Sequence, residues 1–532
     1  MLKKLNRYYH TLKYLKPIQI RYQIRYRLWD RFFPVEIAED KKTPNFQEVS
    51  LSPFPEQFEH YLGNHQLSLL NQKHTFDRSI DWNYSGYGKL WTYHLNYFDY
   101  LHQHGMTWVT GNELMDDFLA DILHLKDGME PYPISLRTIN WIKFLAVHQS
   151  FPQEIINSIY AQFQVLRKKL EYHLLGSHLL ENCFSLLCGF VFFQDDKLTQ
   201  LAKKILTIEL EEQILDDGAH FELSPMYHII LLQRALDGYN LLINNDHDLN
   251  EIQKLLEQKI QKMVNWLNTL MFRNGDIPMF NDSTYRQALD PYTVLQYAEQ
   301  LGFTPEKVEL SQSGYREFET GDFEIVADVG GVGPSYQPGH AHCDMLSFIL
   351  YYKGKPIIVD RGVSTYEKNS LREIERGTSS HNTVMINGKE QSDVWGGFRV
   401  GRRAIPKIKK DRDNVLSASH TGYDHIGCNH SRKWTIEDNH LQIEDWVEGE
   451  IKRAEAFFHF HPNVKVQQTG NGTFRIENLI LKIEGFHSAE LETYEYCLGF
   501  NKRREASRLR VVFVDRLKTV ISKDSPQSDT EH

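Results

Sequence analysis

The stretch Gly339-His340-Ala341-His342-Cys343-Asp344-Met345-Leu346-Ser347-Phe348 places three titratable side chains at alternate positions ahead of an apolar run. Side chains on a β-strand alternate between its two faces, so a strand here would put His340, His342 and Asp344 on one face. A lone histidine in a strand is usually structural, and the polar face of a half-exposed strand would look similar. Three ionisable groups beside an apolar run favour a functional site instead.

The apolar run continues to Tyr352, and a second apolar run follows Gly354 and ends at Asp360. A turn between two such runs predicts a β-hairpin. His381 stands at the head of another strand-like segment. Histidines and aspartates on neighbouring strands therefore predict one shared site in this half of the chain.

Length and composition limit the classes of protein. A chain of 532 residues is too long for one ordinary core, so we expect two or three domains. The hydrophobic share of 41% and the charged share of 24% are typical of a globular protein. A net charge of −10 argues against nucleic-acid binding, and an acidic substrate would have to meet a local basic patch.

The five cysteines are odd in number and include no C-x-x-C pair, so they do not predict a disulfide framework. Lys, Arg and Tyr interrupt every apolar run before residue 34, unlike a secretory signal. No run approaches the ~18 apolar residues of a membrane span. We expect a cytoplasmic protein without an organic cofactor.

Residues 1–31 carry nine Lys or Arg against one acid, with Leu and Ile between the charges. Alternation from Ile18 to Leu28 fits a strand, whereas Pro17 would suit the start of a helix, so the secondary structure stays open. A basic amphipathic arm could make peripheral contact with an anionic membrane. Packing of the arm on the acidic body is the equally weighted alternative.

The remaining chain divides into regions that differ in the spacing of their apolar residues. Residues 1–84 are predicted to form the arm and a connection, 85–310 a helical domain, 311–520 a β-rich domain and 521–532 a disordered tail. Apolar residues at three-and-four spacing in 154–174 and 249–270 predict amphipathic helices that stack into a bundle or toroid. Short β-rich runs after Gly321 favour an antiparallel sandwich. The fold class is multidomain α+β.

Two polar groups interrupt the helical half. One face of an otherwise apolar helix carries His178, Glu181 and Asn182. Burying unpaired polar groups costs free energy, so these three side chains predict a functional role. Tyr227 lies in the first turn of a Pro-started helix, near the positive end of the helix dipole. That location predicts a phenol pKa below its reference value of about 10.

Five segments resemble, in order, the heparinase II/III family of polysaccharide lyases. They are S-H-L-L-E-N (177–182), D-G-A-H-F-E-L-S-P-M-Y-H (217–228), G-H-A-H-C-D (339–344), V-D-R-G (359–362) and S-H-N-T-V (380–384). The resemblance spans roughly residues 85–460 and implies an N-terminal (α/α) toroid followed by an antiparallel β-sandwich. It also implies β-elimination of an acidic, uronate-containing polysaccharide, and offers a periplasmic location as an alternative. Such a lyase neutralises the uronate carboxylate, removes the C5 proton and protonates the departing O4.

Residue by residue, the resemblance assigns Tyr227 as the catalytic acid and possible base. His340 matches the histidine on the sandwich side of the cleft, and His178 its partner on the toroid side. Glu181 matches an acidic active-site position of some members. Further candidates for contact with the sugar or its carboxylate are Asn182, Arg137, Asn140, Glu222 and Arg399. Arg399 belongs to a basic stretch, 398–410, which also reads as a solvated hairpin edge.

His342, Asp360 and His381 match the metal ligands of zinc-containing members. Two imidazoles, one carboxylate and a water would complete a tetrahedral Zn²⁺ site that braces the sandwich near the cleft. A hydrogen-bonded cluster without metal is the alternative.

One position departs from the family pattern: many members have Asn before the toroid histidine, where this chain has Ser177. The departure puts the standard uronate contact in question. It favours, as an alternative, a catalytically silent polysaccharide-binding protein. A glycoside hydrolase is a third reading, and it would need two carboxylates about 5–9 Å apart, for which Glu181 and Glu222 are the obvious pair. The lyase remains the leading hypothesis, with a place in surface-polysaccharide assembly.

Overall fold

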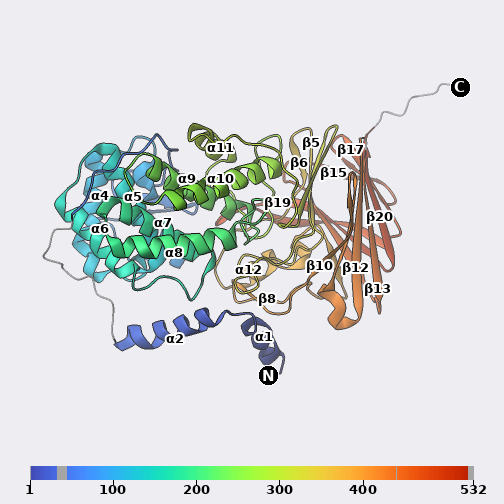
Figure 1. The fold of residues 1–532 in the computed structure, drawn as a ribbon. Helices are drawn as coiled ribbons and strands as arrows, with labels where there is room; N and C mark the ends of the chain where they lie inside the picture. The colour runs from blue at the N-terminus through green and yellow to red at the C-terminus, as the bar shows by residue number, and fades with distance from the viewer. Residues whose placement is uncertain (1, 33–44, 439, 525–532) are drawn as a thin grey trace.

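Helices fill the first half of the chain and antiparallel strands the second, and the two halves lie end to end (Figure 1). The computed structural model describes residues 2–32, 45–438 and 440–524. The predicted α+β class, with a helical toroid followed by antiparallel β-sheets, is confirmed.

The helical half is built from amphipathic helices that bury one face against their neighbours. Helix α6 buries Ile155, Ile159 and Phe163, as the spacing predicted, but it ends at Leu166, before the expected end at residue 174. The helices are α3 (Lys89–Leu95), α4 (Trp108–Asp121), α5 (Pro131–His148), α6 (Gln153–Leu166), α7 (Gly176–Phe193), α8 (Asp196–Gln213), α9 (Pro225–Ile243), α10 (Asn250–Leu270) and α11 (Pro291–Gln300).

Helix α7 lies at the centre of this half, packed against α5, α8 and α9. Within the described residues it is the one helix long and apolar enough to cross a bilayer, yet 94% of that window is buried inside the protein. Burial on all sides is what a core helix shows. The polar groups that α7 carries therefore lie next to, or inside, the domain core.

Three larger antiparallel sheets and one two-stranded ribbon (Val394–Trp395 with Arg399–Val400) form the second half of the described chain. The eight-stranded sheet has the order β10-β11-β12-β13-β20-β17-β16-β15, and the two four-stranded sheets have the orders β18-β19-β14-β7 and β3-β4-β5-β6. The strands of the large sheet are β10 (Pro406–Arg412), β11 (Val415–His420), β12 (Cys428–Glu437), β13 (His440–Gly449), β15 (Val466–Gly470), β16 (Thr473–Ile476), β17 (Leu479–Glu484) and β20 (Arg516–Lys523). Those of the smaller sheets are β3 (Tyr315–Thr320), β4 (Phe323–Asp328), β5 (Phe348–Tyr352), β6 (Lys355–Ile358), β7 (Val384–Ile386), β14 (Ala454–His459), β18 (Ser488–Gly499) and β19 (Lys502–Phe513).

The predicted hairpin is present, because β5 pairs with β6 around a turn whose Lys353 and Gly354 have positive φ. The expectation that His340, His342 and Asp344 share one face of a strand is wrong. Residues 339–347 form a loop, and the strand begins only at Phe348. A loop frees the two histidines from strand alternation, so their side chains can converge.

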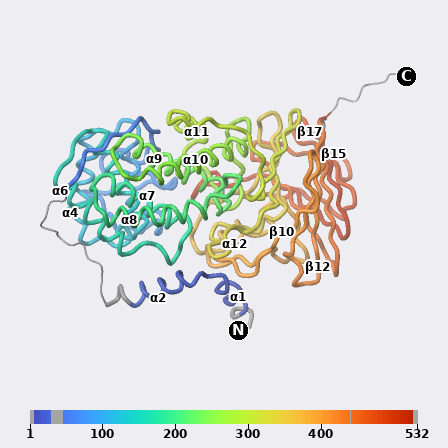
Figure 2. Tube along the Cα trace, viewed as in Figure 1, coloured from blue at the N-terminus to red at the C-terminus, as the bar shows by residue number. Residues whose placement is uncertain are grey.

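The chain termini differ from expectation in detail. Strand β20 runs to Lys523, three residues into the predicted tail, and residues 525–532 lie outside the described part. The N-terminal arm forms two helices, α1 (Leu2–Leu12) and α2 (Pro17–Phe32), with Pro17 starting the second. Figure 2 shows the arm along one side of the molecule, α1 beside the sandwich and α2 beside the toroid.

Candidate active site

Tyr227 and His340 meet where the toroid joins the sandwich. Their rings lie 4.0 Å apart, centroid to centroid, with 32° between the planes. Tyr227 stands in the first turn of α9, where the Ser224 side chain caps the helix by accepting the Tyr227 amide. The Tyr227 hydroxyl also lies 3.2 Å from the hydroxyl of Tyr366. The two predicted catalytic side chains, one from each domain, are thus brought into direct contact.

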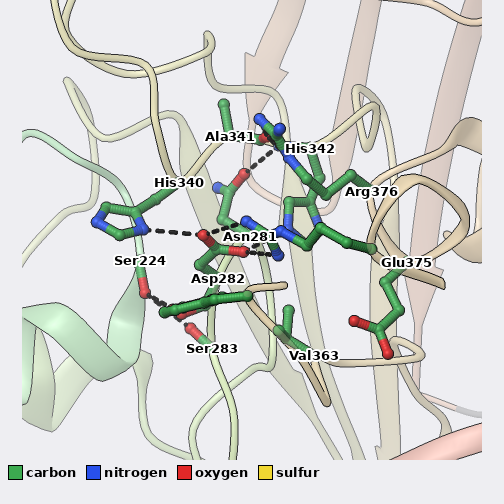
Figure 3. A network of polar contacts seen from close by, with 12 residues as sticks. Ser224, Asn281, Asp282, Ser283, His340, Ala341, His342, Val363, Glu375 and Arg376 are labelled. Carbon is green, nitrogen blue, oxygen red and sulfur yellow. Dashed lines mark hydrogen bonds and ion pairs between the residues drawn. The ribbon is translucent and has the colours of Figure 1, made fainter. Parts of the chain in front are cut away.

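Asp282 organises the sandwich side of this contact (Figure 3). Its Oδ2 lies 2.9 Å from His340 Nδ1, and its Oδ1 lies 2.8 Å from His342 Nε2. The Arg372 guanidinium donates to both oxygens, at 2.5 and 2.6 Å. Burial alone would raise the pKa of Asp282, but Arg372 and the two histidines hold that pKa well below its usual value. An ionised, fully buried carboxylate therefore fixes the position of both rings.

The segment that carries Asp282 also ties the domains together. Ser224, at the start of α9, donates to the Asp282 backbone carbonyl at 3.1 Å and lies 3.1 Å from the Ser283 hydroxyl. The Asn281 side chain accepts the His342 amide at 3.0 Å. Tyr227 and the histidine loop consequently share one support, residues 281–283.

The predicted pKa shift of Tyr227 is wrong. Burial raises the pKa of this phenol well above its ordinary value, and the negative charges of Asp282 and Glu222 add to the increase. The hydrogen bond from Tyr366 and the Arg372 charge oppose it only in part. The helix dipole expected to favour the phenolate is outweighed, so the surroundings of Tyr227 favour its neutral phenol form.

Ser177 and Glu222 form one unit on the toroid side. The Ser177 amide donates to Glu222 Oε1 at 2.9 Å, and its hydroxyl donates to Oε2 at 3.1 Å. Glu222 Oε2 lies 3.4 Å from His340 Nε2. Burial would raise the pKa of Glu222, but His340, His220 and the Ser177 amide lower it overall. At the position where many family members have Asn, this chain therefore uses its side chain to hold an ionised glutamate beside His340.

His178 is held by Glu171, a residue that sequence reasoning did not select. His178 Nδ1 lies 3.0 Å from Glu171 Oε1, and Asn182 donates to the other oxygen at 3.0 Å. Burial would lower the pKa of His178, but the charge and hydrogen bond of Glu171 raise it overall. With 32% of its side chain exposed, His178 can present a positive charge to a ligand. Asn182 is buried and donates to Glu171, so it supports His178 indirectly, through Glu171.

Three other predicted site residues point elsewhere. Glu181 is fully buried and pairs with Arg234 at 2.8 Å. Arg137 is fully buried and donates to the carbonyls of Asn96 and Gly128, which leaves it inside the toroid core. Asn140 is also buried, and its amide donates to the Tyr97 carbonyl. In this conformation none of the three reaches the Tyr227–His340 pair.

Arg399 lies on the short hairpin formed by β8 (Val394–Trp395) and β9 (Arg399–Val400). It is exposed and stacks over the Trp395 ring at 4.7 Å. The neighbouring Phe398 lies 6.1 Å from the His340 ring, centroid to centroid. The hairpin thus brings a basic side chain to the edge of the site.

The predicted metal ligands form a buried cluster. His342 Nε2 bonds Asp282, His381 Nδ1 bonds Asp360 at 2.7 Å, and the two imidazole rings lie 5.3 Å apart. Two imidazoles on one tetrahedral zinc have ring centroids about 5 Å apart, given Zn–N bonds of about 2 Å. In the described residues no three His, Cys, Asp or Glu side chains already stand as a metal-binding group. The Asp360 carboxylate already forms hydrogen bonds with the His381 ring and the Gly362 amide.

Three buried atoms in this cluster nevertheless lack a hydrogen-bond partner within the protein: His342 Nδ1, His381 Nε2 and Asp344 Oδ2. A carboxylate that holds the far nitrogen of a metal-binding histidine is the usual outer support of such sites. Asp360 suits that supporting role, while Asp344 offers the free oxygen. The donor chemistry therefore fits a zinc ion, with Asp344 in the position predicted for Asp360.

Sequence reasoning missed Asp282, Arg372, Tyr366 and Glu171. Asp282 stands in Phe280-Asn281-Asp282-Ser283-Thr284, a polar run that resembles an ordinary link between domains. Arg372 lies on the short helix α12 (Ser370–Glu375). The contacts of Asp282, Arg372 and Tyr366 join segments far apart in the chain, and no local spacing signals them. Glu171 lies only seven residues before His178, but it precedes the helix that carries His178 and so falls outside the helical spacing.

Together these features define a toroid–sandwich protein with a tyrosine–histidine pair at the domain junction. Two family models match its sequence, heparinase II/III N-terminus over residues 134–311 and heparinase II/III-like, C-terminal, over residues 304–528. The chain belongs to the heparinase II/III-like family.

Curated relatives are distant. A heparin-sulfate lyase of Pedobacter heparinus is 25% identical over 303 residues, which cover 52% of this chain and 45% of the relative. A heparin-sulfate lyase of Bacteroides stercoris is 24% identical over 312 residues, covering 53% and 45%. The chain thus aligns with less than half the length of these relatives.

Solved structures agree on the fold. A heparinase III crystal structure superposes with a TM-score of 0.69 at 16% identity, covering 97% of this chain and 93% of the other. The heparan sulfate lyase HepC from Pedobacter heparinus gives 0.54 at 17% identity, covering 87% and 82%. At these identities the likeness concerns the architecture.

Proposed function

We propose that this protein is a polysaccharide lyase that cleaves an acidic, uronate-containing polysaccharide by β-elimination. The observation that carries the proposal is the contact between Tyr227 and His340, with His340 fixed by the buried carboxylate of Asp282. A phenol and an imidazole side by side supply the acid and the base that elimination requires.

Each residue has a distinct part in the proposed reaction. His340 Nε2 accepts the C5 proton, while Asp282 orients the ring from Nδ1. The C5–H electron pair becomes the C4=C5 double bond, and the C4–O4 bond breaks. The Tyr227 hydroxyl gives its proton to the departing O4, and proton transfer from His340 restores the phenol.

The uronate carboxylate needs a positive partner. His178, whose pKa Glu171 raises, supplies one from the toroid side. Ser177 does not substitute for the usual Asn as a direct contact, because Glu222 occupies both its amide and its hydroxyl. Arg399, at the edge of the site, binds an acidic group of the polysaccharide next to the cleaved uronate.

A glycoside hydrolase is less well supported. The reaction needs a second carboxylate across the scissile bond. Glu181 is fully buried against Arg234, and Glu222 already contacts Ser177 and His340. The predicted carboxylate pair is therefore not assembled.

We propose a structural zinc ion in the buried cluster, held by His342, His381 and Asp344. When bound, it would link the loop of residues 339–347 to the segment that carries His381, just before β7, as a fixed positive centre. We also propose that the substrate is a polysaccharide assembled at the cell surface. Finding the protein in the culture medium after cell fractionation would refute this last placement.

The decisive experiment is a screen of acidic polysaccharides for the ultraviolet absorbance of an unsaturated uronate product. The Tyr227→Phe and His340→Ala variants should each lose at least about 100-fold in rate, as expected for general acid–base groups. Tyr292→Phe is a matched control, since Tyr292 also stands at the capped start of a helix but its hydroxyl donates to the backbone carbonyl of Arg273. New reducing ends without absorbance would indicate hydrolysis. Substrate binding without turnover, unaffected by Tyr227→Phe, would indicate a silent binding protein.

A further inference from the structure

Helix α2 turns its apolar side chains outward. Ile20, Ile24 and Leu28 recur every four residues and so form one stripe along the helix. Their exposed fractions are 45%, 54% and 59%. An amphipathic helix on a globular protein normally buries such a stripe. Here the stripe faces away from the body.

The inner face of α2 is polar and aromatic instead. Gln19 is 1% exposed and donates to the carbonyls of Leu174 and Tyr336. Tyr22 packs against the Tyr172 ring at 4.7 Å, and the Tyr26 hydroxyl donates to the Leu170 carbonyl at 2.5 Å. The body thus binds α2 through hydrogen bonds and rings, and the outward position of the isoleucines is fixed.

Arginines border the apolar stripe on both sides. At 100° per residue, Arg27 projects along one edge, and Arg21 and Arg25 project along the other. All three are exposed. An apolar stripe between cationic edges is the pattern of a helix that lies in the interface of an anionic bilayer.

The arm also concentrates exposed apolar surface. In the described residues, seven of the twenty exposed large apolar side chains lie between residues 8 and 28, including Tyr9 at 63% and Leu12 at 55%. The other thirteen are scattered from Leu62 to Leu491. The arm is therefore the part of the described sequence in which exposed apolar side chains are most concentrated.

Contacts with the sandwich domain add to those that α2 makes with Leu170, Tyr172 and Leu174 of the toroid. Arg7 forms an ion pair with Asp393 at 2.7 Å, and the Trp395 indole donates to Thr11. Lys16 lies over the Tyr336 ring at 3.8 Å. Figure 1 shows α1 and α2 on the same side of the two domains, with α1 at an angle to α2. The arm is therefore a preformed surface.

We propose that the outer face of the arm binds the surface of an anionic membrane. Nine basic residues and one acid give residues 1–31 a positive charge, whereas the whole chain is at −10. The negative headgroups of the bilayer would pair with the arginines, and its apolar layer would take up the Ile20–Ile24–Leu28 stripe. Because Lys16 and Gln19 both contact Tyr336, and His340 follows in the same loop, docking would also set the orientation of the proposed Tyr227–His340 site relative to the membrane.

The test is co-sedimentation of the full chain with vesicles of phosphatidylcholine alone or with 30% phosphatidylglycerol. The wild type should bind the anionic vesicles and release them at high salt. Arg21→Gln with Arg25→Gln should weaken binding about 25-fold, from about fivefold per arginine near a charged surface. Ile24→Asp should weaken it at least tenfold, with an unchanged melting temperature.

Val109→Asp is the matched control, since Val109 is 62% exposed on the toroid surface and should bind as the wild type does. Equal binding to both kinds of vesicle, or binding unaffected by the arm variants, would overturn the proposal. So would a dimer in sedimentation velocity that Ile24→Asp dissociates while vesicle binding is absent.

Discussion

Tyr227 and His340 form a tilted ring stack with a centroid separation of 4.0 Å, although one belongs to helix α9 and the other to a loop of the sandwich domain. The pair depends on a third residue, because Asp282 fixes His340 from the side opposite Glu222. The first prediction concerns this support.

Asp282→Asn should lower kcat/KM about 100-fold, because the amide keeps only one acceptor oxygen for the two histidine rings that the carboxylate orients. The same change leaves the Arg372 guanidinium buried without a counter-charge. Unfolding free energy should therefore fall by about 3–5 kcal/mol. Product absorbance and thermal denaturation measure the two effects.

Asp276→Asn is the control, since this nearby carboxylate accepts a bond from Tyr351 away from the site. Arg372→Lys separates stability from catalysis. It keeps a positive charge beside Asp282, so it should lower stability more than activity. A folded Asp282→Asn protein with full activity would show that Asp282 does not position the base.

The limits of sequence reasoning follow from the same contacts. Three-and-four spacing predicted α6 and α10, and turn chemistry predicted the β5–β6 hairpin, because these signals are local. The strand expected at His340 failed, since alternating polar residues also occur in a loop that folds back on a carboxylate.

Electrostatic expectations failed for a related reason. The helix-dipole argument for Tyr227 considered one element, whereas burial between two domains decides its pKa. Asp282 and Arg372 could not be found from spacing, since each is an isolated residue in a polar segment. Burial and pairing across domains are properties of the tertiary fold.

A second prediction concerns pH. The pKa of His178 is raised, so its charged form persists above the ordinary value of 6.5 and its stabilising pairing with Glu171 is lost as the pH rises through the raised pKa. KM for an acidic polysaccharide should accordingly be lowest below that pKa and increase above it. Glu171→Gln should move the increase to lower pH, because burial then acts without the opposing charge.

Steady-state kinetics between pH 5 and 9 give the profile, and NMR titration of the His178 ring gives its pKa directly. Glu56→Gln is a matched control at the exposed pair of Glu56 with His104, and it should not change the profile. A KM profile that stays the same in Glu171→Gln would remove His178 from carboxylate recognition.

A third prediction concerns the metal. Protein purified with zinc should contain about one zinc per chain by elemental analysis, and chelation should lower its melting temperature. Asp344→Asn and His381→Ala should abolish binding. Asp360→Asn should only weaken it by about 10–100-fold, as for a group that supports a ligand.

His461→Ala serves as the control, because His461 is a partly buried histidine outside the cluster. Equal zinc loss in Asp344→Asn and Asp360→Asn would contradict the distinction between ligand and support. Absence of zinc together with no effect of chelation would favour the hydrogen-bonded cluster.

The last prediction concerns Arg432, which is fully buried in the sandwich. Its guanidinium pairs with Asp445 and donates to the carbonyls of Leu346 and Asn382, at 2.7 and 2.6 Å. Those two residues belong to the segments that carry His342 and His381. Lysine keeps the charge but lacks the planar fork that makes these bonds together.

Arg432→Lys should therefore lower unfolding free energy by several kcal/mol, since buried carbonyls and a carboxylate lose donors at about 1–3 kcal/mol each. Activity and zinc affinity should fall together, although Arg432 makes no contact with Tyr227 or His340 among its described hydrogen bonds. Arg503→Lys, at an exposed pair with Glu495, should cost less than about 1 kcal/mol. If Arg432→Lys lost stability while its zinc affinity and kcat/KM stayed at the wild-type values, the sandwich core and the two site loops would be energetically independent.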